Sequence, residues 1–269
     1  MTIYSMWYQG FENAPDFVKR IHEIWCRLNP DHVAHVIGGE EADELLFAEG
    51  IEPGKLTMQV RANIVRAVLL ADRGGVWRDV SLIPSVPLAD WLPQALDQEA
   101  FFAFRNPGEG RILSNWFLAS EVGHPLMAAW REAYVSYFRT DRTVAREAPY
   151  WVRFKNRRRI RRDPASFASP EIARKTKYYP YFIMHYHFAW LIQTQPELAA
   201  LWARVPNRPA TEALRLRPVV EAQQGQLDDP TLNALLSTAP VHKIRWKKNA
   251  ELYDKVLTQI ERGLSERGI

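Results

Sequence analysis

Short apolar segments alternate with amphipathic segments over the first third of the chain, and this alternation constrains the fold most. Residues 3–9 and 32–37 are short apolar runs typical of strands. Between them, apolar side chains recur every three or four residues, as on one buried face of a helix: Phe17, Val18, Ile21, Ile24, Trp25 and Leu28. Residues 40–49 and 57–73 are helical in pattern, and an apolar strand follows at 75–83. This order predicts a Rossmann-like α/β sheet that begins with parallel strands.

The rest of the chain mixes strands and helices with less regularity. We expect strands at 101–105, 112–119 and 241–246, helices at 124–138, 181–194 and 249–266, and an irregular segment at 206–218. The chain contains no internal repeat and no low-complexity linker. We therefore predict one domain over residues 1–269, with a more helical second half.

The composition excludes several classes of protein. Hydrophobic residues make up 47% of the chain and charged residues 25%, as in ordinary globular proteins. Cys26 is the only cysteine, which excludes an intrachain disulfide and a cysteine-based zinc site. The first residues lack the pattern of a secretory signal, and no apolar run reaches the roughly 18 residues of a membrane span. The sequence therefore favours a cytoplasmic location.

The positive charge of the chain is concentrated in one segment. The formal net charge is +4, and Arg153–Arg162 contains seven basic residues in ten, so the remainder carries a net charge of −3. Few aromatic residues interleave with these basic residues, and no nucleic-acid-binding motif accompanies them. We therefore expect no nucleic acid, and favour a peripheral contact with anionic lipid. A solvated surface and a nucleic-acid-binding surface are the alternatives.

A carboxylate follows the strand predicted after Gly74 and Gly75. Asp79 and Ser81 lie at positions i and i+2 where that strand ends. Ligands of α/β sheets bind beyond the carboxyl ends of strands, and oxygen ligands there can hold a hard divalent cation. On spacing alone, an aspartate that caps a turn is the simpler interpretation.

Three segments together strengthen the ligand-binding interpretation. They are Met6–Gly10 with Asn13–Pro15, then Ala62–Arg66 with Leu69, Leu70 and Gly74–Asp79, and finally Val241–Lys247. In content and order they resemble the capsular polysaccharide synthesis protein family, relatives of the sugar transferases with a DXD motif. The resemblance implies a GT-A fold, which is a single Rossmann-like domain with a central mixed sheet. It also implies a nucleotide-sugar-binding part at 1–120 and an acceptor-side part at 121–269.

The resemblance further implies a glycosyltransferase. Such an enzyme moves a sugar from a nucleotide sugar, such as a UDP-sugar, to a glycan or lipid-linked acceptor in bacterial surface polysaccharide synthesis, with retention of configuration. We expect it at the inner face of the cytoplasmic membrane. The implied catalytic residues are Asp79, Asn115 and Lys243. Asp79, Ser81 and His242 would bind Mn²⁺ or Mg²⁺. The implied donor-binding residues are Trp7, Tyr8, Gln9, Gly10, Asn63, Arg66, Trp77, His242 and Lys243.

Two residues depart from the family pattern. Asn63 stands where the family has an aspartate, and Ser81 replaces the second aspartate of the DXD motif. Both substitutions remove a carboxylate, which leaves open a degenerate protein that binds sugar nucleotides without catalysis. His185 and His187 lie on opposite sides of a predicted helix, so we expect at most one of them to face the acceptor.

Overall fold

A five-stranded mixed sheet forms the centre of the protein. The computed structural model describes residues 1–245, 247 and 249–268. The strand order is β2-β1-β3-β6-β5, in which β1 runs parallel to β2 and β3, while β6 runs antiparallel to β3 and β5. The bounds are β1 Thr2–Met6, β2 Val33–Ile37, β3 Gly75–Arg78, β5 Phe101–Gly108 and β6 Arg111–Ser120. The prediction of an α/β fold with a central mixed sheet is confirmed.

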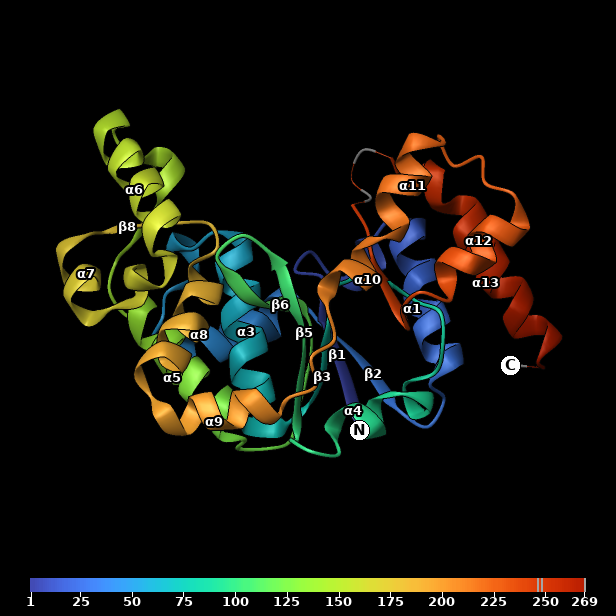
Figure 1. Ribbon diagram of the computed structural model, residues 1–269, viewed down its shortest axis with the longest axis horizontal. Coiled ribbons are helices and arrows are strands. Elements are labelled where there is room, and N and C mark those ends of the chain that lie inside the picture. Colours follow the sequence, from blue (N-terminus) through green and yellow to red (C-terminus); the bar gives the residue numbers. More distant parts are fainter. Residues whose placement is uncertain (246, 248, 269) are drawn as a thin grey trace.

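Helices cover both faces of this sheet (Figure 1). One face carries α2 Gly39–Ala48, α3 Met58–Arg73, α5 Pro125–Phe138, α8 Ile183–Thr194 and α9 Pro196–Arg204. The other carries α1 Asp16–Leu28, α4 Leu92–Leu96, α10 Ala210–Leu214, α11 Leu216–Ala222, α12 Asp229–Leu236 and α13 Asp254–Glu266. In Figure 1, α6 Tyr150–Arg162 stands out from the body, with α7 Pro170–Lys175 below it. Short 3₁₀ helices occupy Phe11–Asn13, Pro53–Lys55, Leu88–Asp90, Ala145–Glu147, Pro164–Ala168 and Ala250–Tyr253.

The alternation of side chains along the strands divides the core in two. Val76 packs on the face of α1, and its neighbour Trp77 packs on the face of α3. Phe101 and Phe102 on β5 are divided in the same way, and both are fully buried. Because successive side chains on a strand point to opposite faces, residue parity decides which layer each one stabilises.

Two glycines allow α3 to turn directly into β3. Thr57 begins the helix by accepting a hydrogen bond from the Val60 amide at 3.4 Å. Gly74 ends it with φ +62°, and Gly75 follows with φ +101°. A Cβ atom would lie 2.8 Å from the Val122 nitrogen at Gly74, and 2.6 Å from the Thr2 oxygen at Gly75. Both the backbone angles and the close contacts therefore require glycine.

Two predictions about elements were wrong. The strand expected at 75–83 is interrupted after Arg78, and β4 Leu82–Pro84 pairs outside the central sheet with β9 Val241–Lys243. The segment expected to be irregular at 206–218 contains α10 and the start of α11. Two of its three prolines, Pro209 and Pro218, lie at the N-cap of α10 and in the first turn of α11, where proline does not interrupt helical hydrogen bonding. A second two-stranded sheet joins β7 Thr143–Val144 to β8 Tyr178–Tyr179.

Candidate active site

A cavity of about 850 Å³ lies beyond the carboxyl end of β3. Its walls come from α3, the turn after β3, β6, α8, the segment from α10 to α11, and β9. The structure brings together six of the predicted site residues in this wall: Asn63, Arg66, Asp79, Ser81, Asn115 and Lys243. They come from segments up to 180 positions apart in the sequence.

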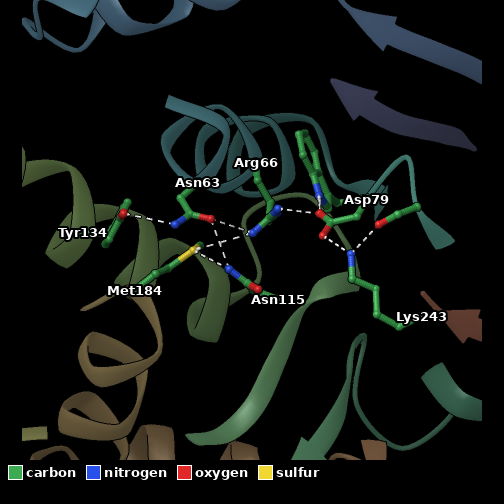
Figure 2. A network of polar contacts seen from close by, with 9 residues as sticks. Asn63, Arg66, Asp79, Asn115, Tyr134, Met184 and Lys243 are labelled. Carbon is green, nitrogen blue, oxygen red and sulfur yellow. Dashed lines mark hydrogen bonds and ion pairs between the residues drawn. The ribbon is translucent and has the colours of Figure 1, made fainter. Parts of the chain in front are cut away.

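The Asp79 carboxylate is bound on both oxygens (Figure 2). Oδ1 accepts hydrogen bonds from Arg66 Nη2 at 2.9 Å and from the Trp77 indole at 3.2 Å. Oδ2 accepts from Lys243 Nζ at 2.6 Å. Burial raises the pKa of Asp79, but Lys243 and Arg66 outweigh that effect and hold the pKa below its ordinary value. Asp79 is therefore an ionised carboxylate fixed between two cations.

Lys243 reaches this carboxylate because β9 pairs with β4. The antiparallel register sets Lys243 opposite Leu82, directly after Ser81 in the chain. Its ammonium donates to Ser81 Oγ at 2.7 Å as well as to Asp79. The ammonium therefore bridges the two side chains expected to hold a metal ion.

His242 faces away from this cluster. It is fully buried, and its Nε2 donates to the Leu236 carbonyl at 3.1 Å and lies 3.3 Å from Ser85 Oγ. Burial lowers the pKa of His242 to about 4. Neighbouring residues on a strand point to opposite faces, so a β9 that directs Lys243 toward Asp79 turns His242 into the core. His242 therefore does not line the cavity, and its position does not fit the metal-binding and donor-binding roles expected for it.

These residues do not fit a divalent cation. Mg²⁺ and Mn²⁺ favour several oxygen ligands, carboxylates above all. Asp79 supplies one carboxylate, which is already paired with two cations, and Ser81 supplies one hydroxyl that accepts from Lys243. In the described part of the chain, no three His, Cys, Asp or Glu side chains are grouped so that they could hold a metal.

A buried polar network holds Arg66 in place (Figure 2). Asn63 Oδ1 accepts from Arg66 Nη1 at 2.8 Å and from Asn115 Nδ2 at 3.1 Å, while Asn63 Nδ2 donates to the Tyr134 hydroxyl at 3.3 Å. The guanidinium also lies over the Trp77 ring, 4.7 Å from its centroid. Trp77 is buried beneath Arg66 and is a positioning residue, since it supports both Arg66 and Asp79.

The residues expected to hold the base and ribose lie outside this cavity. Trp7, Tyr8, Gln9 and Gly10 follow β1, which is parallel to β3, so they occupy the same edge of the sheet as Asp79. None of them lines the cavity. The Tyr8 hydroxyl donates to Asp43 Oδ2 at 2.7 Å and accepts from Arg61 Nη1 at 2.5 Å. Their contact with a nucleotide stays a prediction.

The cavity also contains residues that the sequence did not single out as ligands. Arg111 from β6 and the pair Arg217 and Glu221 from α11 line it. Arg217 and Glu221 are joined by an ion pair of 3.4 Å. The i, i+4 spacing of Arg217 and Glu221 is a local signal for a helix, but Arg217 falls in the segment 206–218 that the sequence predicts to be irregular. Trp246, part of the C-terminal motif, lies outside the described residues.

The two histidines of α8 are divided as expected. His185 lines the cavity, and burial together with Arg111 and Arg66 lowers its pKa to about 3. His187 is buried on the other side, where its Nδ1 donates to the Ile183 carbonyl at 2.9 Å. His185 therefore faces the cavity as a neutral imidazole.

Comparisons with known proteins agree with the resemblance seen in the sequence. The chain is 26% identical over 155 residues to O-glycosyltransferase PaGT of Phomopsis amygdali, a match that covers 50% of the chain and 38% of that protein. It is 25% identical over 153 residues to O-glycosyltransferase braB of Annulohypoxylon truncatum, covering 49% of the chain and 36% of that protein. The matched part thus spans less than two fifths of these relatives.

One solved structure aligns with nearly the whole chain. The structure titled PaToxG Glycosyltransferase covers 98% of this chain and 86% of its own, with a TM-score of 0.40 and 14% sequence identity. The model of the family described as capsular polysaccharide synthesis protein matches residues 1–150, more than half of the chain. The protein therefore belongs to the capsular polysaccharide synthesis protein family.

Proposed function

We propose that this protein is a glycosyltransferase that transfers a sugar from a nucleotide sugar, such as a UDP-sugar, to a glycan or lipid-linked acceptor in surface polysaccharide synthesis. The observation that carries the proposal is the cluster of Asp79, Arg66 and Lys243 at the carboxyl edge of the sheet, inside a cavity of about 850 Å³. A cavity of this size is in the range that encloses a small-molecule ligand. The names of the two curated relatives support the same activity.

The proposed reaction assigns a distinct role to each side chain. Lys243 and Arg66 bind the donor diphosphate and stabilise the negative charge that develops on it as the bond to the sugar breaks. Asp79 holds both cations in position. Asn115 lies beside Asn63 on the cavity wall, where its amide can bind a sugar hydroxyl.

We propose that transfer retains the anomeric configuration. Among the described cavity residues the carboxylates are Asp79 and Glu221, and each is paired with a cation. Neither is free to act as a nucleophile or as a general base, so we expect the acceptor to attack from the side of the departing diphosphate. A diphosphate oxygen then takes the acceptor proton. Nuclear magnetic resonance of the first product would test this, because an inverted anomer contradicts front-face transfer.

The activity itself is tested with Asp79→Asn. This variant keeps the shape of the side chain but removes the charge that holds Lys243 and Arg66. A panel of nucleotide sugars is first screened for thermal stabilisation of the wild type, which identifies the donor. Turnover of that donor should then fall about 100-fold or more in the variant. Asp141→Asn is the matched control, because Asp141 pairs with Lys55 on the exposed surface. Turnover close to wild type in a folded Asp79→Asn protein would contradict the proposal. Transfer or hydrolysis by the wild type would exclude a degenerate binding protein.

We also propose that α6 contacts an anionic membrane near a lipid-linked acceptor. Its first two turns expose Tyr150, Trp151 and Phe154, which are 76%, 69% and 53% exposed. Arg153 and Lys155 flank Phe154, and the other five basic residues of Arg153–Arg162 follow on the same helix. Exposed aromatic residues beside cations are typical of helices that bind the interface of anionic bilayers. None of the described helices combines the length and apolar character needed to cross a bilayer.

Co-sedimentation with vesicles tests the membrane contact. Binding to vesicles of phosphatidylserine and phosphatidylcholine should fall when Arg157, Arg158 and Arg159 are replaced by glutamine, and also when Trp151 is replaced by alanine. Replacing Lys255 and Arg262, which pair with Asp229 on another surface, should leave binding unchanged. Unchanged sedimentation of the α6 variants would reject the proposal. If the protein bound RNA more tightly than vesicles, and did so through these α6 residues, α6 would be a nucleic-acid-binding surface instead.

A further inference from the structure

We propose that this site binds the donor diphosphate without a divalent cation, because the Lys243 ammonium occupies the place between Asp79 and Ser81 that a metal ion would need. The inference rests on the proposed function and deepens it. Three independent features of the cavity support it: the contacts of the ammonium, the charge of the walls, and the two residues that depart from the family pattern.

The ammonium uses the oxygen atoms that a metal would coordinate. Nζ of Lys243 lies 2.6 Å from Asp79 Oδ2 and 2.7 Å from Ser81 Oγ. An ammonium has three N–H donors, and no third acceptor for Lys243 is found among the described residues. Lys243 lines the cavity and its side chain is 20% exposed. The remaining N–H is therefore available to a phosphate oxygen.

The cavity wall already has a surplus of positive charge. Among its described residues, six side chains are cationic and two are carboxylates, namely Arg66, Arg111, Arg217, Lys243, Arg245 and Lys247 against Asp79 and Glu221. A nucleotide sugar carries two negative charges on its diphosphate. A divalent cation would add to the surplus and be repelled, whereas the diphosphate offsets part of it without assistance.

Asn63 and Ser81, the two departures from the family pattern, both leave the cavity wall more positively charged. Asn63 accepts the hydrogen bond of Arg66 without neutralising it, whereas an aspartate there would pair with that guanidinium. Ser81 likewise accepts from Lys243 without adding a negative charge. The two missing carboxylates thus leave both cations with charge to spare for an anionic ligand.

The proposed step balances without a metal. The bond between the sugar C1 and the diphosphate oxygen breaks, and its electron pair stays on the diphosphate. A bond forms between C1 and the acceptor oxygen, whose proton passes to a diphosphate oxygen. Lys243 and Arg66 stabilise the departing anion by charge-assisted hydrogen bonds.

Binding measurements distinguish this proposal from a metal-dependent site. UDP and inorganic pyrophosphate are titrated by calorimetry into the wild-type protein, with EDTA or with Mn²⁺. We expect at least one of the two ligands to bind in EDTA with an affinity within about threefold of that in Mn²⁺. Lys243→Met should weaken this binding roughly 10- to 100-fold, the size of a hydrogen bond to a charged group. Lys55→Met removes an exposed lysine and should have no effect.

A designed variant tests the same idea in reverse. Ser81→Asp combined with Lys243→Ala gives Asp79 a second carboxylate as its neighbour and removes the ammonium between the two positions. Electron paramagnetic resonance should then detect Mn²⁺ binding that the wild type lacks, and UDP binding should become dependent on Mn²⁺.

Two results would overturn the inference in different ways. Stoichiometric Mn²⁺ binding by the wild type, or ligand binding that EDTA abolishes, refutes metal-free binding but leaves the glycosyltransferase proposal standing. Failure of UDP, pyrophosphate and every nucleotide sugar of the panel to bind under both conditions refutes the donor site, and with it both proposals.

Discussion

Asn63 is the buried junction of the polar network, and replacing it with leucine should destabilise the protein. Leucine has the same branched shape but cannot accept from Arg66 and Asn115 or donate to Tyr134. The hydrogen bond from the charged Arg66 contributes about 1.5–3 kcal/mol and the two neutral ones about 0.5–1.5 kcal/mol each. Burial of the leucine methyl groups returns about 1–2 kcal/mol. We expect a net loss of roughly 2–4 kcal/mol, or about 4–7 °C in Tm.

Urea denaturation followed by tryptophan fluorescence, together with calorimetry, measures this loss. Asn233→Leu is the matched control, because Asn233 is exposed and accepts one surface hydrogen bond from Gln259 at 3.0 Å. It should change the unfolding free energy by less than about 0.5 kcal/mol. A double-mutant cycle of Asn63→Leu with Tyr134→Phe should show coupling, since the two side chains share a hydrogen bond. An Asn63→Leu protein as stable as the wild type would refute the claim that this network orders Arg66.

Three further predictions follow from separate parts of the structure. Gly75→Ala should lower the unfolding free energy by about 2–4 kcal/mol, because Gly75 has φ +101° and a Cβ there would lie 2.6 Å from the Thr2 oxygen. Urea denaturation measures this loss. Gly54→Ala is the control and should be tolerated, since a Cβ at Gly54 meets open space. Burial lowers the pKa of His187 and His242 to about 4, below the value of about 6.5 in the unfolded chain. The unfolded state therefore binds protons first as the pH falls, so the free energy of unfolding is highest above pH 6.5 and decreases toward pH 4. His187→Phe should flatten this decline in Tm between pH 6.5 and 4, and an unchanged slope would contradict it. Glu221→Gln should leave the turnover number within about threefold of wild type if transfer is front-face, whereas a loss of 100-fold would indicate a general base and inversion.

The local structure of the first hundred residues was largely predictable from the sequence. The helix face of α1 follows from apolar residues at spacings of three and four, and the end of α3 follows from Gly74. These signals are local, because periodicity and backbone freedom depend on neighbouring residues alone. The position of Asp79 at the end of a strand was predictable because the strand pattern is also local. The family was predictable because its motifs are short and occur in a fixed order.

The character of the site was decided by contacts between distant segments. Lys243 lies 164 positions from Asp79 in the sequence, and only the pairing of β4 with β9 places its ammonium between Asp79 and Ser81. The same pairing turns His242 into the core. A sequence pattern shows that one of two neighbouring strand residues faces a site, but the register decides which one. The motif residues were therefore foreseeable from the sequence, whereas their partners, and with them the charge of the site, depended on the tertiary structure.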